Sequence, residues 1–214
     1  MIKYNQGRKH LKTLYKKGGK KMGQYYTAVL KDENGKLKGY YDFGLKLMEH
    51  SYFMNHYVNT ICNKIYNKPH NVAWVGDYAE EENEFTYYER NKKAHHQVKH
   101  TNKNFMQCLL INHTKKQVLD LTDYYNNSII NYYKEGRKDN WVIHPLPLLT
   151  AFGNGLGGGD YRESKAINKD KVGMWAGDLI EIKPYNDDYK WDHENKTYKY
   201  KDYESIMILF DEGY

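Results

Sequence analysis

The amino-acid sequence predicts an α+β fold: a single domain built on a mostly antiparallel sheet with two or three helices. Short strand-like runs are joined by tight turns, and two segments between them carry apolar residues at helical spacing. Strands that are paired by short turns and separated into groups by helices are typical of α+β domains. Residues 22–214 have the length of one domain and are few for two. Residues 1–21 form a basic extension outside this domain.

A hairpin opens the predicted domain. Residues 24–31 and 37–43 are rich in aromatic and β-branched residues, and Asn34-Gly35 between them favours a tight turn. Further strands are predicted at 71–76, 105–112, 117–121, 141–144, around Trp175, at 179–183, in a polar hairpin near 189–200, and at 205–210. The unbroken apolar run of 205–210 predicts a central strand. Pro145 and Pro147 predict a sheet edge or a departure from the sheet, because proline cannot donate to a strand ladder.

Two helices follow from apolar spacing, and a third follows from charge. Over 52–67, apolar residues recur four positions apart, beginning with Phe53. A second helix is predicted from Thr122, as its N-terminal cap, to Gly136, where glycine favours termination. Around 84–99, acidic residues precede basic ones, an order that suits the dipole of a solvent-exposed helix.

The positive charge of the chain is concentrated at its start. Residues 1–21 contain eight Lys and Arg residues and no acidic residue, whereas the whole chain has 33 Lys and Arg, 27 Asp and Glu, and a net charge of +6. Without residues 1–21, 25 basic side chains face 27 acidic ones, which gives a net charge of −2. Nucleic-acid binding is therefore expected only through residues 1–21.

Two interpretations of residues 1–21 remain open. The extension is a basic arm, or it is a translated ribosome-binding site, because Lys17-Gly18-Gly19-Lys20-Lys21-Met22 is naturally encoded by a purine run followed by a start codon. The segment lacks the apolar core and cleavage site of a signal peptide. No stretch of the chain approaches the roughly 20 apolar residues of a membrane span, so no membrane partner is expected.

The two cysteines indicate a reducing compartment. Cys62 and Cys108 lie in apolar segments and are predicted to be buried thiols, because nothing in their spacing favours a disulfide framework or a metal site. The expected location is therefore the cytoplasm.

A glycine-rich stretch at 153–159 is predicted to be a loop. It contains a G-x-G-x-x-G match at Gly153, Gly155 and Gly158, but the residues that follow it lack the helical periodicity that a dinucleotide site requires. Two interpretations remain: a long mobile loop, or a loop whose backbone N–H groups approach a phosphate or another anion beside Arg162. The residues predicted to contact a ligand are Glu49, His50, Asn154, Gly155, Gly157, Gly158 and Arg162.

Two Trp-x-Gly-Asp tetrapeptides end in Asp77 and Asp178. Gly-Asp is favourable turn chemistry and explains both of them without a function. The alternative hypothesis places both carboxylates in one cleft, as metal ligands or acid-base groups.

Histidines at predicted strand ends extend this hypothesis. His113 and His144 each follow or end a strand, where loops present side chains to a common site. The candidate catalytic residues are Asp77, His113, His144, Asp160 and Asp178, and the first four are also candidate metal ligands. No pair has metal-ligand spacing along the chain, so scattered surface or capping histidines remain the alternative. No cofactor is predicted, although a divalent metal is compatible with this set. Walker, G-x-S-x-G and H-x-[ST] repeat motifs are absent from the sequence.

Several sequence blocks carry a resemblance to a family. They are Met22-Gly23-Gln24-Tyr25-Tyr26, Lys46-Leu47-Met48-Glu49-His50-Ser51, Trp74-Val75-Gly76-Asp77-Tyr78-Ala79, Asn112-His113-Thr114-Lys115-Lys116 and His144-Pro145-Leu146-Pro147-Leu148-Leu149-Thr150, with the glycine-rich loop. Together they resemble proteins of phages and prophages in low-GC Gram-positive bacteria. The resemblance implies a chain that begins at the Met22 block and acts inside a bacterial cell, and it implies no catalytic role.

Three functions are therefore expected in order of preference. The first is a phage accessory protein that binds a host protein or a nucleotide ligand, as an inhibitor of host defence would. The second is a metal-dependent hydrolase of a phosphodiester or nucleotide, with the carboxylates and histidines holding the metal. The third is nucleic-acid binding through residues 1–21. The sequence makes no prediction of the oligomeric state.

Overall fold

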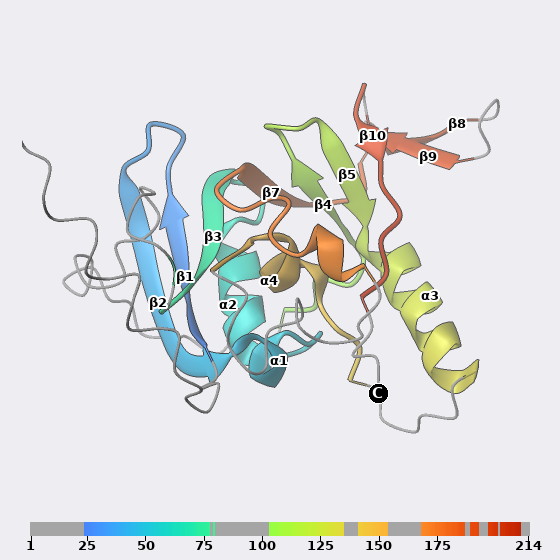
Figure 1. The fold of residues 1–214 in the computed structure, drawn as a ribbon. Helices are drawn as coiled ribbons and strands as arrows, with labels where there is room; N and C mark the ends of the chain where they lie inside the picture. The colour runs from blue at the N-terminus through green and yellow to red at the C-terminus, as the bar shows by residue number, and fades with distance from the viewer. Residues whose placement is uncertain are drawn as a thin grey trace, which may run out of the picture.

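A computed structural model describes residues 24–77, 79, 103–134, 141–153, 168–186, 189–192, 197–200 and 202–210. In this part of the chain, one sheet of eight strands dominates, and four α-helices accompany it (Figure 1). All strand pairs of this sheet are antiparallel except β10 with β5 and β3 with β6. The predicted α+β fold with a mostly antiparallel sheet is confirmed.

The strands follow the order β10, β5, β4, β7, β3, β1, β2 across the sheet, and β6 pairs with β3 next to β7. Their bounds are β1 (Tyr25–Lys31), β2 (Leu37–Lys46), β3 (His70–Gly76), β4 (Cys108–Asn112), β5 (Gln117–Asp120), β6 (Ala151–Phe152), β7 (Leu179–Pro184) and β10 (Glu204–Ser205). A separate hairpin of β8 (Tyr189–Asp192) and β9 (Thr197–Tyr200) lies beside β10 (Figure 1). The helices are α1 (Leu47–His50), α2 (His56–Lys64), α3 (Leu121–Lys134) and α4 (Pro145–Leu149).

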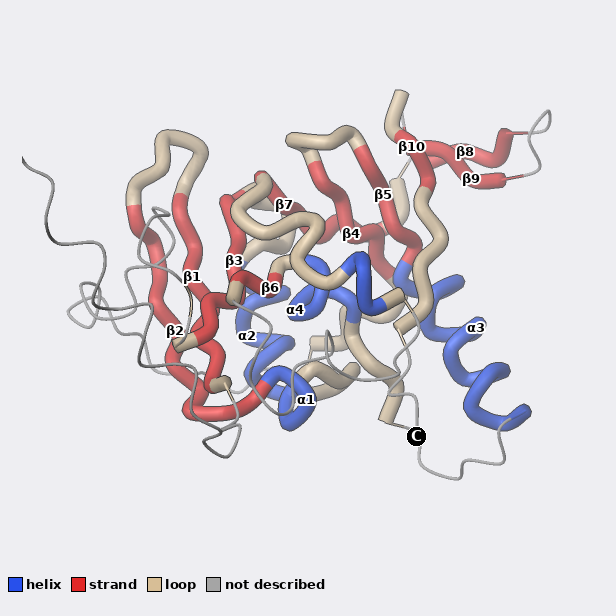
Figure 2. The backbone as a smooth tube through the Cα atoms, viewed as in Figure 1, coloured by secondary structure: helices blue, strands red, loops and turns tan. Residues whose placement is uncertain are grey.

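Both faces of the sheet carry buried apolar residues. The helices lie on one side of the sheet (Figure 2). The main core lies on that face, where residues such as Leu30, Trp74 and Leu110 pack with helix residues. On the opposite face, a cluster around Val29 and Val75 and another around Ile111 are also buried. This two-sided burial explains why β3 and β4 are continuous apolar runs rather than alternating ones.

The two longer helices begin at side-chain caps. Asn55 accepts hydrogen bonds from the N–H groups of Tyr57 and Val58 at the start of α2. For α3, Asp120 accepts from the N–H groups of Thr122, at 2.8 Å, and Asp123, at 3.2 Å. The predicted cap at Thr122 is therefore wrong by two positions, because the carboxylate at the end of β5 already satisfies the first turn.

The segment 141–144 is not a strand. Ile143 forms only an isolated bridge to Tyr52, and His144 caps the short helix α4 by accepting from the N–H of Leu146. Pro145 and Pro147 lie in the first turn of α4, where the missing N–H costs nothing. The predicted departure from the sheet occurs, and it leads into a helix.

Two other predicted strands are wrong. Trp175 lies in a series of turns over 172–177, and its ring is fully buried. The segment 205–210 is not central, because β10 covers only Glu204–Ser205 at the end of the described sheet order. The apolar run instead buries Ile208 and Phe210 in the core as irregular chain. The apolar run thus indicated burial correctly at Ile208 and Phe210 but not at Met207, which is 73% exposed, and it indicated the strand position incorrectly.

The remaining predicted elements divide into confirmed and undescribed ones. The 24–31 and 37–43 hairpin is confirmed, with β2 extending to Lys46, and Cys62 and Cys108 are buried free thiols as predicted. The predicted helix at 84–99, the basic extension and residues 154–159 of the glycine-rich loop lie outside the described residues.

Candidate functional site

The structure describes half of the predicted site residues. These are Glu49, His50, Asp77, His113, His144 and Asp178. Asn154, Gly155, Gly157, Gly158, Asp160 and Arg162 lie outside the described residues.

His113 and Asp178 are brought together at one end of the sheet. His113 opens the turn 113–116 between β4 and β5, and Asp178 immediately precedes β7. Because β4 and β7 are antiparallel neighbours, the end of one strand lies beside the start of the other, and the N–H of His113 donates to the carbonyl of Leu179 at 2.9 Å. We call the 113–116 turn, together with the 174–178 turn that contacts it, the turn platform.

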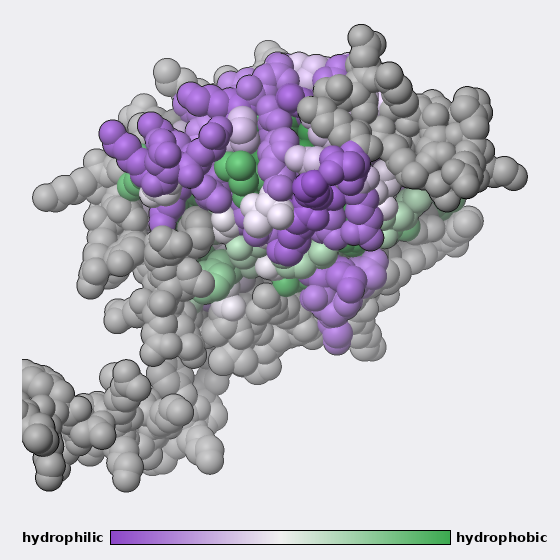
Figure 3. All heavy atoms as spheres, turned by 90° about the horizontal axis from the view of Figure 1, so that it is seen from above, coloured by the Kyte–Doolittle hydropathy of each residue, from purple (hydrophilic) through white to green (hydrophobic). Residues whose placement is uncertain are grey.

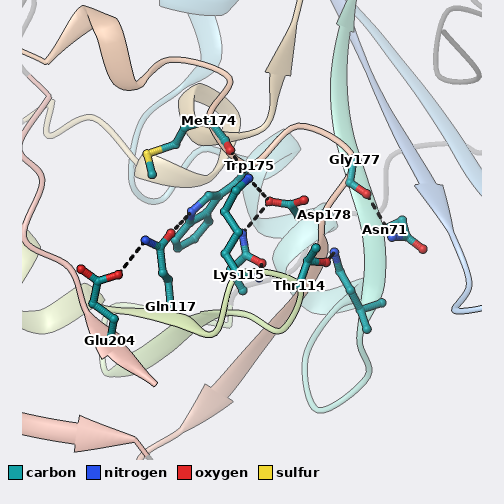
Figure 4. Close-up of polar contacts among 11 residues, drawn as sticks. Asn71, Thr114, Lys115, Gln117, Met174, Trp175, Gly177, Asp178 and Glu204 are labelled. Carbon is teal, nitrogen blue, oxygen red and sulfur yellow. Dashed lines mark hydrogen bonds and ion pairs between the residues drawn. The ribbon is translucent and has the colours of Figure 1, made fainter. Parts of the chain in front are cut away.

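Asp178 is the centre of the turn platform (Figure 4). Its carboxylate oxygen Oδ2 accepts from the Lys115 ammonium at 2.6 Å and from the Asn112 amide at 2.8 Å. The same ammonium donates to the carbonyl of Met174. Since a charge-assisted bond at a partly buried carboxylate is stronger than a neutral one, Lys115 fixes the two turns to each other.

A second set of bonds extends the turn platform on both sides (Figure 4). The indole N–H of Trp175 donates to Gln117 at 2.8 Å, and the Gln117 amide donates to Glu204 at 3.0 Å. On the other side, the Asn71 amide donates to the carbonyl of Gly177 at 3.0 Å. Gly177 has φ +80°, a conformation that favours glycine, so the second Trp-x-Gly-Asp tetrapeptide is indeed turn chemistry.

His113 belongs to a chain of three hydrogen-bonded side chains. Its Nε2 lies 2.9 Å from a carboxylate oxygen of buried Glu181, and its Nδ1 lies 2.9 Å from the Tyr203 hydroxyl. The Lys183 ammonium lies 3.6 Å from the same carboxylate oxygen of Glu181. In a neutral imidazole one nitrogen donates and the other accepts, so the Glu181 carboxylate places the proton on Nε2 and leaves Nδ1 to accept from Tyr203. Such a chain orients a base beside a hydroxyl.

Three residues of these hydrogen-bonded sets were not among the predicted site residues: Glu181, Tyr203 and Lys115. Glu181 carries a usable signal, because it is an acidic residue between Ile180 and Ile182 in a largely apolar strand and is only 4% exposed. A charge in that position requires a partner. Nothing in the local sequence indicates Tyr203 or Lys115, because the hydrogen-bond partners of their side chains lie 59 to 90 residues away along the chain.

His144 does not join His113. It is buried at the start of α4, where Nδ1 accepts from the Leu146 N–H at 3.2 Å and Nε2 lies 3.8 Å from the Cys62 sulfur. Burial lowers the pKa of His144 to about 3, and burial also raises the pKa of the Cys62 thiol. Both ring nitrogens are thus committed to the fold.

His50 and Glu49 are also structural. The His50 ring is fully buried, with Nδ1 2.7 Å from the carbonyl of Lys46 and Nε2 accepting from the Trp74 indole N–H at 2.8 Å. Burial lowers the pKa of His50 to about 4. The Glu49 carboxylate accepts from the backbone N–H of Lys46 at 2.8 Å and so caps α1.

Asp77 lies at the opposite end of β3 from Asp178. Its carboxylate accepts from the Tyr25 N–H at 3.1 Å at the end of the β1 and β3 pair, whereas Asp178 lies next to Val72 near the start of β3. Five residues of extended strand separate these points by about 16 Å. The hypothesis that both Trp-x-Gly-Asp carboxylates point into one cleft is therefore wrong.

No group of three or more His, Cys, Asp or Glu side chains that could hold a metal ion occurs in the part of the chain that the structure describes. His113 contacts one carboxylate, and Asp178 is neutralised by an ammonium. Of the four candidate metal ligands, Asp160 lies outside this part, and the other three lie at separate places.

Figure 3 views the end of the molecule that carries the β1–β2 and β4–β5 turns, and most described atoms on this face are hydrophilic.

No protein-family model, curated protein or solved structure matches this chain. None of the described helices has the length and apolarity that crossing a membrane requires.

Proposed function

We propose that this protein is a phage-encoded accessory protein that binds a host protein or a nucleotide ligand, in the manner of an inhibitor of host defence. The observation that supports binding is the turn platform, where Lys115 and Asp178 join two turns that are distant in the sequence. A surface that is ordered before it meets its partner loses less conformational entropy on association. The phage setting rests on the family resemblance of the sequence blocks.

The state of the described candidate residues favours binding over metal-dependent hydrolysis. His50 and His144 use both ring nitrogens within the fold, and Asp178 is engaged by Lys115 and Asn112. A hydrolytic metal requires ligands with free lone pairs that converge on one point. These three side chains are instead used to hold elements together.

The exposed side of the turn platform gives the protein a mixed-charge surface. Lys116 is 61% exposed and pairs with Asp202, itself 66% exposed, at 2.6 Å. Such exposed charges contribute little to stability and are available to steer an approaching partner. A nucleotide ligand would use the glycine-rich stretch and Arg162, as the sequence predicts.

The proposal is tested by expressing the chain in a host whose defence restricts a phage, and by capturing partners from the same cells. We expect expression to raise the plating efficiency of the restricted phage, and we expect one host protein, or a nucleotide released on denaturation and identified by mass spectrometry, to be retained. Unchanged plating together with no retained partner would overturn the proposal.

A matched pair of variants places the contact. Lys116→Glu reverses a charge on the turn platform, while Lys38→Glu reverses a charge on β2, where Lys38 is 41% exposed and pairs with Asp32 at 3.0 Å. Lys116 immediately precedes β5 and Lys38 lies on β2, and these strands are five places apart in the sheet, about 24 Å. Partner capture should weaken with Lys116→Glu and persist with Lys38→Glu. Equal loss in both would remove the platform as the contact surface.

A further inference from the structure

A groove opens beside the C-terminal part of β5, between the first turn of α3 and residues 205–208. Its cavity volume is about 80 Å³, and Tyr189 of β8 lines one side. The groove exists because β10 pairs with β5 at only two positions and is followed by one further bond, from the Ile206 N–H to the Val118 carbonyl. Beyond Ile206 the chain leaves β5, and the Leu209 carbonyl accepts from Asn168 instead.

The two carboxylates at the groove differ in their engagement. Asp120 accepts from two backbone N–H groups and from the hydroxyls of Tyr185 and Tyr189, each hydroxyl at 2.6 Å. Asp123 lines the same groove, and its carboxylate makes no hydrogen bond or ion pair with any described residue. Burial and the nearby Asp120 raise the pKa of Asp123. One carboxylate therefore faces the groove without a counter-charge among the described residues.

The rest of the groove and its rim are largely apolar. Val118, Leu119 and Ile208 line it, while Met207 at the rim is 73% exposed. Along α3, Asp123, Asn127 and Ile130 follow at i, i+4 and i+7, which places them on one side of the helix. The Asn127 amide lies 3.7 Å from the Met207 sulfur, and Ile130 is 49% exposed. Exposed apolar side chains beside a groove are typical of a protein contact.

We propose that this groove binds an arginine side chain of a partner protein, with the guanidinium at Asp123 and apolar partner residues on Met207 and Ile130. A calcium or magnesium ion would need six or more oxygen ligands, and the groove offers one unengaged carboxylate among apolar walls. An arginine combines an apolar stem with a weakly hydrated, planar cation that can donate two parallel bonds to one carboxylate. The aromatic ring of Tyr189 adds a surface that favours such a cation.

The test uses ethylguanidinium as a probe, titrated into the full chain and followed by the backbone amide signals in nitrogen-proton correlation spectra. We expect saturable shifts at Asp120, Asp123 and Met207. Asp123→Asn should abolish the saturation, whereas Asp170→Asn, at an exposed carboxylate outside the groove, should preserve it. Met207→Lys, which adds a cation at an exposed rim position, should also abolish it while leaving the fold intact.

Linear, unsaturable shifts, or saturation that persists in Asp123→Asn, would overturn the inference, and so would equal saturation by acetate. The inference extends the proposed binding function by naming the chemistry of a partner at a separate surface. Its test is distinguishable from that of the proposed function, because the probe titration requires no host protein and the capture experiment varies Lys116 rather than Asp123.

Discussion

At the scale of single residues, the buried histidines make stability depend on pH. Burial lowers the pKa of His50 to about 4 and that of His144 to about 3, whereas an unfolded histidine titrates near about 6.5. Between these values the unfolded chain binds more protons than the native one, so stability rises with pH. The contribution is fully present above about pH 6.5 and is lost as the pH falls.

Replacement of His144 by Asn tests this linkage. Asparagine can still accept from the Leu146 N–H as a helix cap but does not titrate. We expect the slope of unfolding free energy against pH, measured by urea unfolding between about pH 5 and pH 6.5, to fall by up to one proton, about 1.4 kcal/mol per pH unit. The lost contact with Phe53 lowers stability at every pH and leaves the slope unaffected. An unchanged slope would contradict this account of His144.

At the scale of elements, strand hydrophobicity and helical spacing predict most helices and strands correctly, whereas the connections between elements are predicted poorly. The β1–β2 hairpin, β3, β4, β7, α2 and α3 all follow from periodicity and turn residues, because these are local properties. The segment 205–210 was placed wrongly because an apolar run reports burial, which irregular chain also achieves. Likewise, Pro145 predicts a sheet edge or a departure from the sheet because it cannot donate to a strand ladder, whereas in the structure it occupies the first turn of α4.

The candidate site was less predictable than the fold, for a physical reason. His113 and Asp178 come together only because β4 and β7 are neighbours, and strand order is not written in local sequence. The two Trp-x-Gly-Asp tetrapeptides share a pattern but not a position in the sheet, since the first ends a strand and the second closes a turn. The prediction that their aspartates meet in one cleft is wrong for this reason. Glu181 was the exception, because a lone acid within an apolar strand marks a buried charge wherever that strand lies.

The joint between the two turns of the platform can be tested by stability. Asp178→Asn keeps the shape of the side chain but removes the charge that Lys115 binds. Because Asp178 is partly buried and Lys115 is 41% exposed, we expect a loss of about 1–2 kcal/mol in chemical unfolding. The matched change Asp202→Asn in the exposed pair with Lys116 should cost clearly less than Asp178→Asn, because solvent screens exposed charges. Equal costs would show that Asp178 does not fasten the turns.

At the scale of the whole molecule, the distribution of charge predicts polyanion binding by residues 1–21, whereas stability is expected to come from the rest of the chain. The net charge is +6 for residues 1–214 and −2 for residues 22–214, because residues 1–21 are basic without exception among their ionised side chains. The main cluster of the described core begins at Tyr26, and its members all lie within residues 22–214. Stability and polyanion affinity should therefore respond differently to removal of residues 1–21.

A chain that starts at Met22 provides the comparison. We expect its thermal midpoint to match that of the full chain, because no described core residue is lost. We expect the full chain to bind double-stranded DNA with an affinity that falls steeply with salt, since phosphate contacts by lysines release counterions, and we expect the shorter chain to bind weakly at every salt concentration. The measurement is fluorescence anisotropy of a labelled duplex over a salt series. Equal affinity and equal salt slope in both chains would move the nucleic-acid contact onto the folded domain, where the balance of 25 basic against 27 acidic side chains argues against it.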